Sequence, residues 1–219
     1  MTPRQLRNDL QNAYDLFLEK KISIYNQPIA YEQNGSTIRI SWHQSNETLA
    51  KPKYFGTFKQ YLSIVKDDSY SCLLADGGLL RISYTFKRNR LVAHNLWYYP
   101  CPLDLPRKEL LIEPLIDLAE LYAEAGIDCY RFGGPIRFDY DSERIEEIVH
   151  PATHVHFIRE NCRMPVKRPL SPGTFLKFIF LNFYPELWDS FEFLRDLPEE
   201  TFKQTIFVEE EKLIHFSWR

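Results

Sequence analysis

The sequence predicts an α+β fold built on an antiparallel sheet. Short strands follow one another between residues 70 and 99, and tight turns join them. The predicted helices lie before and after this run and do not alternate with its strands, as is typical of α+β domains. The chain has 219 residues, of which 44% are hydrophobic and 15% aromatic, enough for one substantial core. We therefore expect a single α+β domain, a meander with an N-terminal helix, a middle helix and a buried C-terminal helical region.

The N-terminal region begins with a helix over about residues 3–21. Thr2 and Pro3 supply an N-cap and a first helical residue. Apolar side chains then recur at helical spacing on one face, namely Leu6, Leu10, Ala13, Leu16 and Phe17. Residues 37–42 alternate apolar and polar side chains, which predicts a half-buried strand. Residues 57–66 follow as a short helix.

The clearest hairpins lie between residues 70 and 99. Strands are expected over residues 70–74, 79–86 and 91–99. Asp76-Gly77-Gly78 joins the first two strands, and Asp-Gly is a strong turn signal because both turn positions take positive φ. Residues 87–90 form the second turn. The three strands therefore form an antiparallel meander and not a βαβ unit.

The second half of the chain is divided by its prolines and glycines. We expect, in order, a helix over 109–125 ended by Gly126, strands over 136–141 and 153–158, a buried helix over 172–183 introduced by Ser171-Pro172, a second helix to about Arg195, and a closing hairpin within 206–218. The domain over residues 1–219 then has an N-terminal helix-and-strand extension, 1–55, and a C-terminal extension, 186–219.

Charge and cysteine content exclude several classes of protein. The formal charge is −3, so the chain lacks the overall basic surface of a non-specific nucleic-acid binder. No apolar run reaches the roughly 20 residues of a membrane span, and the polar start lacks the apolar core of a secretory signal. The cysteines form no C-x-x-C pair, which argues against structural zinc and disulfides: Cys72, Cys101, Cys129 and Cys162. We expect a cytoplasmic protein without membrane contact.

Two neighbouring strands each carry a polar face. Residues two apart in a strand share a face, so Arg137, Asp139 and Asp141 point one way from the first strand. His154 and His156 do the same from the second. Three of the six histidines of the chain fall between residues 150 and 156. If the two strands pair, the polar sets meet on one surface.

These residue types can process a phosphoester. His154 and His156 are the candidate acid and base, with His150 as an accessory, because imidazole exchanges protons near neutral pH. Arg137 is the candidate stabiliser of anionic charge. Asp139 and Asp141 are expected to orient a histidine or to hold a metal. A merely solvated strand face is the alternative interpretation.

Two further features bear on the site. Two histidines and two aspartates can bind Mn, Fe or Zn, although their spacing fits no defined metal signature. No cofactor is therefore predicted, and a divalent metal is left open. The loop after the histidine strand is basic and is a candidate phosphate or RNA clamp: Arg159, Arg163, Lys167 and Arg168. His94 can join the site or be a hydrogen-bonded core residue.

Several blocks, in order, resemble the bacterial domain of unknown function 2290 family. They are Asp76 to Phe86, Ile136 to Asp141, His150-Pro151-x-x-His154, Cys162 to Pro172 and Asn182 to Pro185. This resemblance covers about residues 55–185 and implies no activity. The chain is also similar in outline to TumE-type toxins, which have a glycine-turn hairpin, an Arg-x-Asp strand and a histidine-rich segment. That outline implies a ribonuclease-like role in a prokaryotic conflict system, although the tighter Arg-Tyr-Asp-Asn and His-His pattern of those toxins is missing.

Two functions follow as hypotheses. The first is a toxin or phage-defence enzyme that cleaves RNA or another phosphoester with the His/Asp/Arg set. The second is a non-catalytic subunit of a defence complex that binds an operon-encoded protein partner or a nucleic acid through the same surface and the basic loop.

Overall fold

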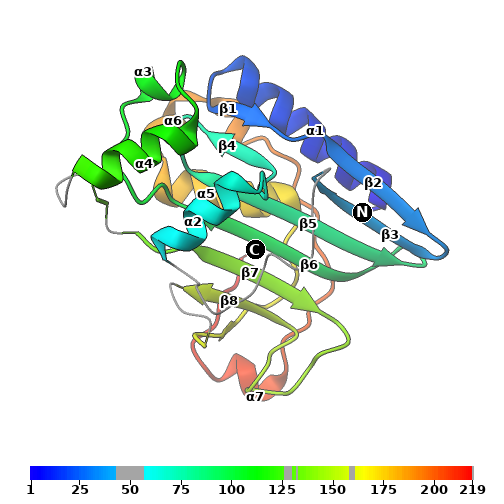
Figure 1. Ribbon diagram of the computed structural model, residues 1–219. Coiled ribbons are helices and arrows are strands. Elements are labelled where there is room, and N and C mark those ends of the chain that lie inside the picture. Colours follow the sequence, from blue (N-terminus) through cyan, green and yellow to red (C-terminus); the bar gives the residue numbers. More distant parts are fainter. Residues whose placement is uncertain (43–56, 126–129, 132, 158–160, 219) are drawn as a thin grey trace.

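The structure, a computed structural model, describes residues 1–42, 57–125, 130–131, 133–157 and 161–218. It confirms the predicted α+β class, with one nine-stranded antiparallel sheet and helices on both of its faces (Figure 1). No helix within these residues is long and apolar enough to cross a membrane. The cysteines described, Cys72, Cys101 and Cys162, are free thiols, whereas Cys129 lies outside the described residues.

The strands run in the order β1-β4-β5-β6-β7-β8-β9 across the sheet. β3 pairs with the far end of β5, and β2 pairs with β3. The strands are β1 (Ser23–Asn26), β2 (Ile29–Asn34), β3 (Thr37–Trp42), β4 (Cys72–Leu74), β5 (Leu79–Lys87), β6 (Arg90–Tyr99), β7 (Ile136–Asp141), β8 (Thr153–Phe157) and β9 (Met164–Pro165). The predicted meander is therefore the centre of the sheet, continued through β7 and β8.

The helices divide between the two faces. They are α1 (Pro3–Glu19), α2 (Phe58–Lys66), α3 (Arg107–Leu110), α4 (Leu115–Ala125), α5 (Pro172–Phe183), α6 (Pro185–Ser190), the 3-10 turn η4 (Glu192–Leu194) and α7 (Val208–Glu211). α1 and α5 pack with the main core on one face. α2 and α4 pack with a second cluster on the other face, at one end of the strands only (Figure 1).

Side-chain caps fix the starts of the two core helices. Thr2 Oγ1 accepts a hydrogen bond from Gln5 N at 3.3 Å, and Gln5 Oε1 accepts one from Thr2 N at 2.9 Å. This capping box satisfies free N–H groups of the first turn. At α5, Ser171 Oγ accepts from Thr174 N at 3.2 Å. Both predicted helix starts are confirmed.

The two hairpin turns differ in the way they obtain their backbone conformation. In the Asp76-Gly77-Gly78 turn only Gly77 has positive φ, +85°, so the expectation of positive φ at both Asp-Gly positions is wrong. Asp76 instead accepts a hydrogen bond from Gly78 N through its side chain, at 2.9 Å, as turn aspartates do. The turn with two positive φ values is the second one, at Arg88 and Asn89.

Three predicted elements are wrong. The helix expected over 109–125 is two helices, because Pro114 cannot continue an upstream helix and disfavours helical backbone at the residue before it. The helix after α5 ends at Ser190 and is followed by η4. The closing hairpin does not form, because residues 208–211 are helical and Phe216 makes a parallel bridge with Val166. The strands β1 and β2 had no sequence prediction, and Gly126 lies outside the described residues.

Gly173 in the first turn of α5 has no room for a side chain. A Cβ atom at this position would lie 1.9 Å from the carbonyl oxygen of Pro198. Because that atom belongs to the backbone of a neighbouring segment, it cannot move away cheaply.

We expect Gly173→Ala to lower the free energy of unfolding by about 3 kcal/mol because of this clash. Helix propensity alone would predict the opposite, since alanine favours a helix more than glycine does. Urea unfolding measures the change. Gly35→Asn is the matched control, since Gly35 has a φ of +58° and open space around it, and asparagine tolerates that φ. A stabilised Gly173→Ala variant would contradict the packing of α5.

Candidate functional site

The sheet has one apolar face and one polar face over its central strands. The apolar face is buried under α1 and α5 by residues such as Ile82, Leu96, Phe138 and Val155. The opposite face carries two polar rows that cross four strands. The strand register defines the first row as Arg81, Trp97, Arg137 and His156, and the second row as Ser83, Asn95, Asp139 and His154. The two predicted polar sets thus meet on one surface, because β7 and β8 pair antiparallel.

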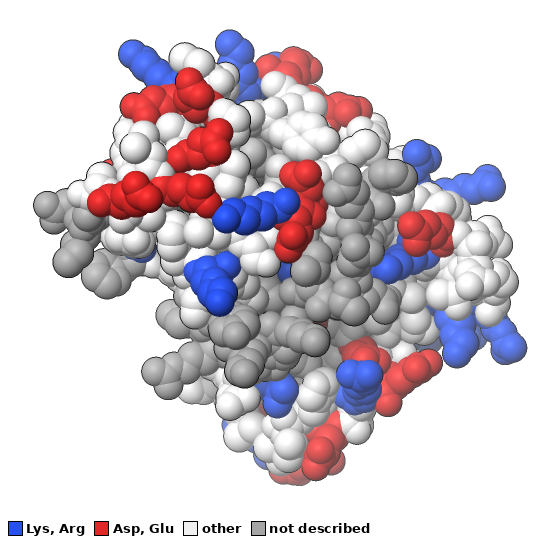
Figure 2. Space-filling model, in the orientation of Figure 1, with Lys and Arg blue, Asp and Glu red and all other residues white. Residues whose placement is uncertain are grey.

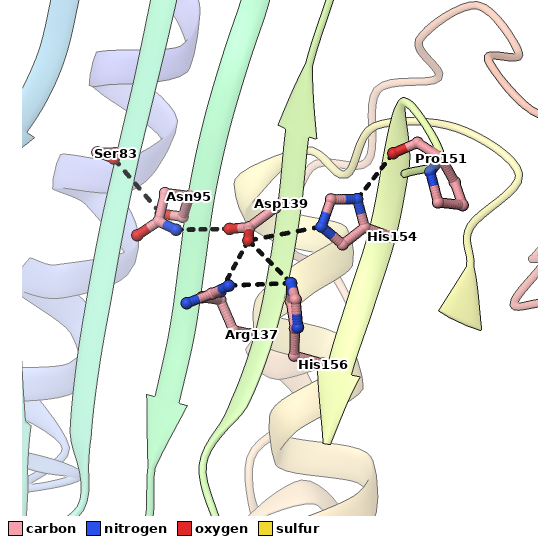
Figure 3. A network of polar contacts seen from close by, with 7 residues as sticks. All are labelled: Ser83, Asn95, Arg137, Asp139, Pro151, His154 and His156. Carbon is pink, nitrogen blue, oxygen red and sulfur yellow. Dashed lines mark hydrogen bonds and ion pairs between the residues drawn. The ribbon is translucent and has the colours of Figure 1, made fainter. Parts of the chain in front are cut away.

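Asp139 is the centre of the polar network (Figure 3). Its Oδ2 lies 2.7 Å from Arg137 Nε, 3.3 Å from His156 Nε2 and 3.8 Å from His154 Nε2. Its Oδ1 accepts a hydrogen bond from Asn95 Nδ2 at 2.5 Å. Burial raises the pKa of this carboxyl, but the contact with His156 and the charge of Arg137 outweigh burial, so the pKa lies well below its usual range. Asp139 is therefore ionised at neutral pH.

His154 presents an unprotonated nitrogen to Asp139. Its Nδ1 lies 2.8 Å from the carbonyl oxygen of Pro151, which can only accept a hydrogen bond, so Nδ1 carries the proton. Burial lowers the pKa of His154 to about 4, against the opposing effect of the Asp139 charge. The imidazole is thus neutral at pH 7, and its Nε2 lone pair faces a carboxylate oxygen 3.8 Å away. Two acceptors at this spacing can share one proton donor between them.

His156 and Arg137 form the buried side of the network. Arg137 Nη2 lies 2.9 Å from His156 Nε2, and the same histidine nitrogen lies 3.3 Å from Asp139 Oδ2. The Arg137 guanidinium also lies over the Trp97 ring, 5.0 Å from its centroid. His156 is 0% exposed and Arg137 is 8% exposed. These two residues hold Asp139 in place rather than facing solvent.

A cavity of about 440 Å³ lies over the polar face. Its charged lining comprises five arginines and two aspartates, namely Arg39, Arg81, Arg137, Arg144, Arg163, Asp139 and Asp141. His150 and His154 also line it, and their rings lie 4.7 Å apart between centroids. Figure 2 shows acidic side chains gathered over α3 and α4, whereas basic side chains on this face are scattered. The excess of positive charge within the cavity favours an anionic ligand.

The structure separates the predicted site residues into three groups. Asp139, His154, His156 and Arg137 form the network, and His150 lies beside it in the cavity. Asp141 lies at the cavity rim, where it accepts a hydrogen bond from Glu143 N at 2.8 Å. Of the basic loop, Arg163 lines the cavity, whereas Lys167 and Arg168 are not among the lining residues. Arg159 lies outside the described residues.

His94 belongs to the core and not to the network. It lies opposite Tyr84 and Tyr140 on the apolar side of the pleat, and its Nε2 accepts a hydrogen bond from Leu170 N at 3.1 Å. Burial lowers its pKa to about 4. His94 is thus a hydrogen-bonded core residue, and it is also among the residues that line the cavity.

Arg81, Asn95 and Trp97 also belong to the polar rows, although they were not predicted as site residues. A signal for them was present, because Arg81, Ser83 and Thr85 alternate with apolar residues along one predicted strand. The same alternation places Asn95 and Trp97 on one face of the next strand. These residues needed the cross-strand register to be connected with Asp139.

Three ligand atoms fit a divalent cation by type and spacing. The atoms from Asp139, His154 and His156 lie within 4.8 Å of one another, and two imidazoles with one carboxylate suit Fe, Mn or Zn. His154 also donates its other N–H to a carbonyl, as metal ligands do. Arg137 already contacts two of the three ligands, however, at 2.7 and 2.9 Å. A cation would require the guanidinium to withdraw, and Asp141 is not part of the group.

The buried neutral state of His154 makes stability depend on pH. Its pKa falls from 6.5 in the unfolded chain to about 4 in the fold. Between these values only the unfolded state binds the proton, so stability is lost as pH falls through this window. Between neutral pH and pH 4, we expect the His154→Gln variant to lose about 3 kcal/mol less of its free energy of unfolding than the wild type loses. Urea unfolding at neutral pH and near pH 4 measures it, with the exposed His215→Gln as control. Equal losses in both variants would contradict the neutral imidazole.

Comparison with known proteins confirms the resemblance to the domain of unknown function 2290 family. The chain matches no curated protein and no solved structure at a significant level. The model of one family, described as "Uncharacterized conserved protein (DUF2290)", matches residues 18–218. The match includes the strands and helices that form the Asp139 network, its cavity and most of the core. The chain belongs to the DUF2290 family.

Proposed function

We propose that this protein is a phosphoester-processing enzyme, ribonuclease-like in its chemistry. One observation carries the proposal. The Nε2 lone pair of His154 and the ionised Oδ2 of Asp139 lie 3.8 Å apart in the lining of an arginine-rich cavity. A hydroxyl group or water placed between two such acceptors loses its proton more easily, which is what a general base provides.

His154 is the proposed base. Its low pKa keeps it unprotonated at neutral pH, and the Pro151 carbonyl fixes its ring through Nδ1. A ribose hydroxyl or a water at Nε2 would give its proton to His154 and attack the phosphorus. The side chain of Asp139 is 19% exposed, so this end of the network is open to a substrate.

The remaining roles follow from position. Arg163 lines the cavity and is the proposed contact for the phosphate undergoing attack, where its guanidinium would stabilise the added negative charge. His150 is the proposed acid for the leaving oxygen, since it shares the cavity with His154. His156 and Arg137 are positioning residues, because His156 is fully buried and bonded to Arg137. The paired roles expected for His154 and His156 are thus revised to His154 and His150.

The biological setting is proposed from the sequence outline. The Arg137-Phe138-Asp139 strand followed by the histidine strand is similar in outline to TumE-type toxins. This supports a cytoplasmic toxin or phage-defence role with RNA as substrate, and an operon-encoded protein as partner. The cavity supports the anionic substrate independently of that outline.

A second candidate is binding without turnover at the same cavity, as part of a defence complex. The observation that favours it is burial. His154 is 2% exposed and His156 is 0% exposed, so the network can also serve as the rigid support of an anion-binding surface. In both candidate functions the arginines of the cavity bind the anion. The two differ in the role of His154, which acts in catalysis in the enzyme and only supports the fold in the binding protein.

We expect His154→Gln to lower the rate of cleavage of single-stranded RNA at least about a hundredfold, because general bases contribute about 10²–10⁴. His150→Gln should lower it by a similar factor. The measurement is the cleavage of labelled RNA and DNA by purified protein, with and without a chelator or added Mn²⁺. His215→Gln is the matched control, being a tail histidine outside the cavity.

The outcome decides between the candidates. Full activity of His154→Gln would contradict the proposed enzyme. RNA binding without cleavage by the wild type would favour the binding subunit. Loss of activity together with loss of folding, seen in the unfolding midpoint, would assign His154 a structural role.

A further inference from the structure

Arg81 is a buried cation for which the described part of the chain supplies no carboxylate. It is 3% exposed, and its one hydrogen bond runs from Nη2 to Ser69 Oγ at 3.2 Å. Among the residues that the structure describes, its Nε and Nη1 have no hydrogen-bond partner. A buried guanidinium with unfilled donors costs free energy unless an anion compensates it.

Aromatic rings compensate the charge only in part. The Arg81 guanidinium carbon lies 4.9 Å from the ring centroid of Trp97 and 5.1 Å from that of Trp42. Such cation–π contacts stabilise a buried cation by less than its burial costs. Burial and the nearby charge of Arg137 lower the pKa of Arg81 to about 10, which still leaves it protonated at neutral pH. The rings thus aim the guanidinium without neutralising it.

The position of Arg81 relates it to the Asp139 network. It lines the same cavity, and in the first polar row it lies two strands away from Arg137, with Trp97 between them. At about 4.8 Å between strands, the two backbones are roughly 10 Å apart. Because Arg137 is already paired with Asp139, an anion that enters the cavity is expected to bind Arg81 in preference to Arg137.

We propose that Arg81 is a phosphate subsite that binds a phosphate group next to the one being cleaved, on the same single strand of RNA. The subsite rests on the proposed function for the identity of its ligand. A planar guanidinium with unpaired N–H groups on two of its nitrogens suits the oxygens of a phosphate. Holding a neighbouring phosphate would fix the strand across the cavity and place the scissile bond at His154.

The experiment measures binding separately from cleavage. Fluorescence anisotropy follows a labelled short single-stranded RNA on His154→Gln protein, alone and combined with Arg81→Met, Arg81→Lys or Arg90→Met. The Arg90 variant is the matched control, since Arg90 is exposed at the start of β6 and outside the cavity. Labelled single-stranded DNA and inorganic phosphate as competitor test whether the ribose is needed.

We expect Arg81→Met to weaken RNA binding by about ten- to a hundredfold, the usual range for a hydrogen bond to a charged group. The slope of log K against log salt should fall by about 0.7 for the lost phosphate contact. Arg81→Lys should retain part of the affinity and Arg90→Met nearly all of it. The unfolding midpoint of Arg81→Met should stay unchanged or rise, because an uncompensated buried charge is removed.

Three results would overturn the subsite. The first is that the His154→Gln protein binds neither RNA nor phosphate, and the second is that the Arg81 and Arg90 variants bind RNA with equal affinity. The third is that Arg81→Met lowers the unfolding midpoint without changing the affinity, which would give Arg81 a purely structural role. Failure of the proposed function is distinguishable. RNA binding that depends on Arg81 without any cleavage by the wild type would leave an anion subsite in a binding protein.

Discussion

The contact between Asp139 and Arg137 is the constraint on which the polar half of this sheet depends. Arg137 and His156 are almost inaccessible to solvent, and a buried guanidinium without a partner costs about 3–5 kcal/mol. Asp139 meets this requirement at 2.7 Å, while Asn95 satisfies its second oxygen. With both charges compensated, polar rows can cross strands whose other face is the apolar core. The site is thus built into the sheet and not carried on a loop.

The same arrangement leaves two groups of this face in states that cost stability. Asp139 compensates the charge of Arg137 but not that of Arg81. The Arg81 guanidinium lies against the Trp42 and Trp97 rings, and within the described residues its Nε and Nη1 have no hydrogen-bond partner. Burial likewise keeps His154 neutral by lowering its pKa, and the fold therefore loses stability at acidic pH. Groups that destabilise a fold in this way are typical of binding and catalytic sites. A site made only for structure would pair or remove them.

The hairpin strands and the capped helices were predictable because their signals are local, whereas β1 and β2 were not predicted. Thr2, Ser171 and the Gly77 turn act within a few residues, so their elements were found. The split at Pro114 and the helix at Val208–Glu211 were missed, the second because Glu210 contacts the distant Ile148 N at 3.2 Å. The Arg137, Asp139, His154 and His156 set was predictable from period-two alternation. Arg81, Asn95 and the burial of His156 were not, since they depend on the pairing of strands far apart in sequence.

The proposed function depends on His154 being a neutral imidazole whose unprotonated Nε2 faces Asp139. Nitrogen-15 NMR of the histidine side chains measures this directly, with His154→Gln used to assign the signals. We expect a proton on Nδ1 and none on Nε2 at neutral pH, with protonation of Nε2 only near pH 4. A charged His154 ring at neutral pH, or a proton on Nε2 donated to Asp139, would contradict it, because no base would then be available in the cavity.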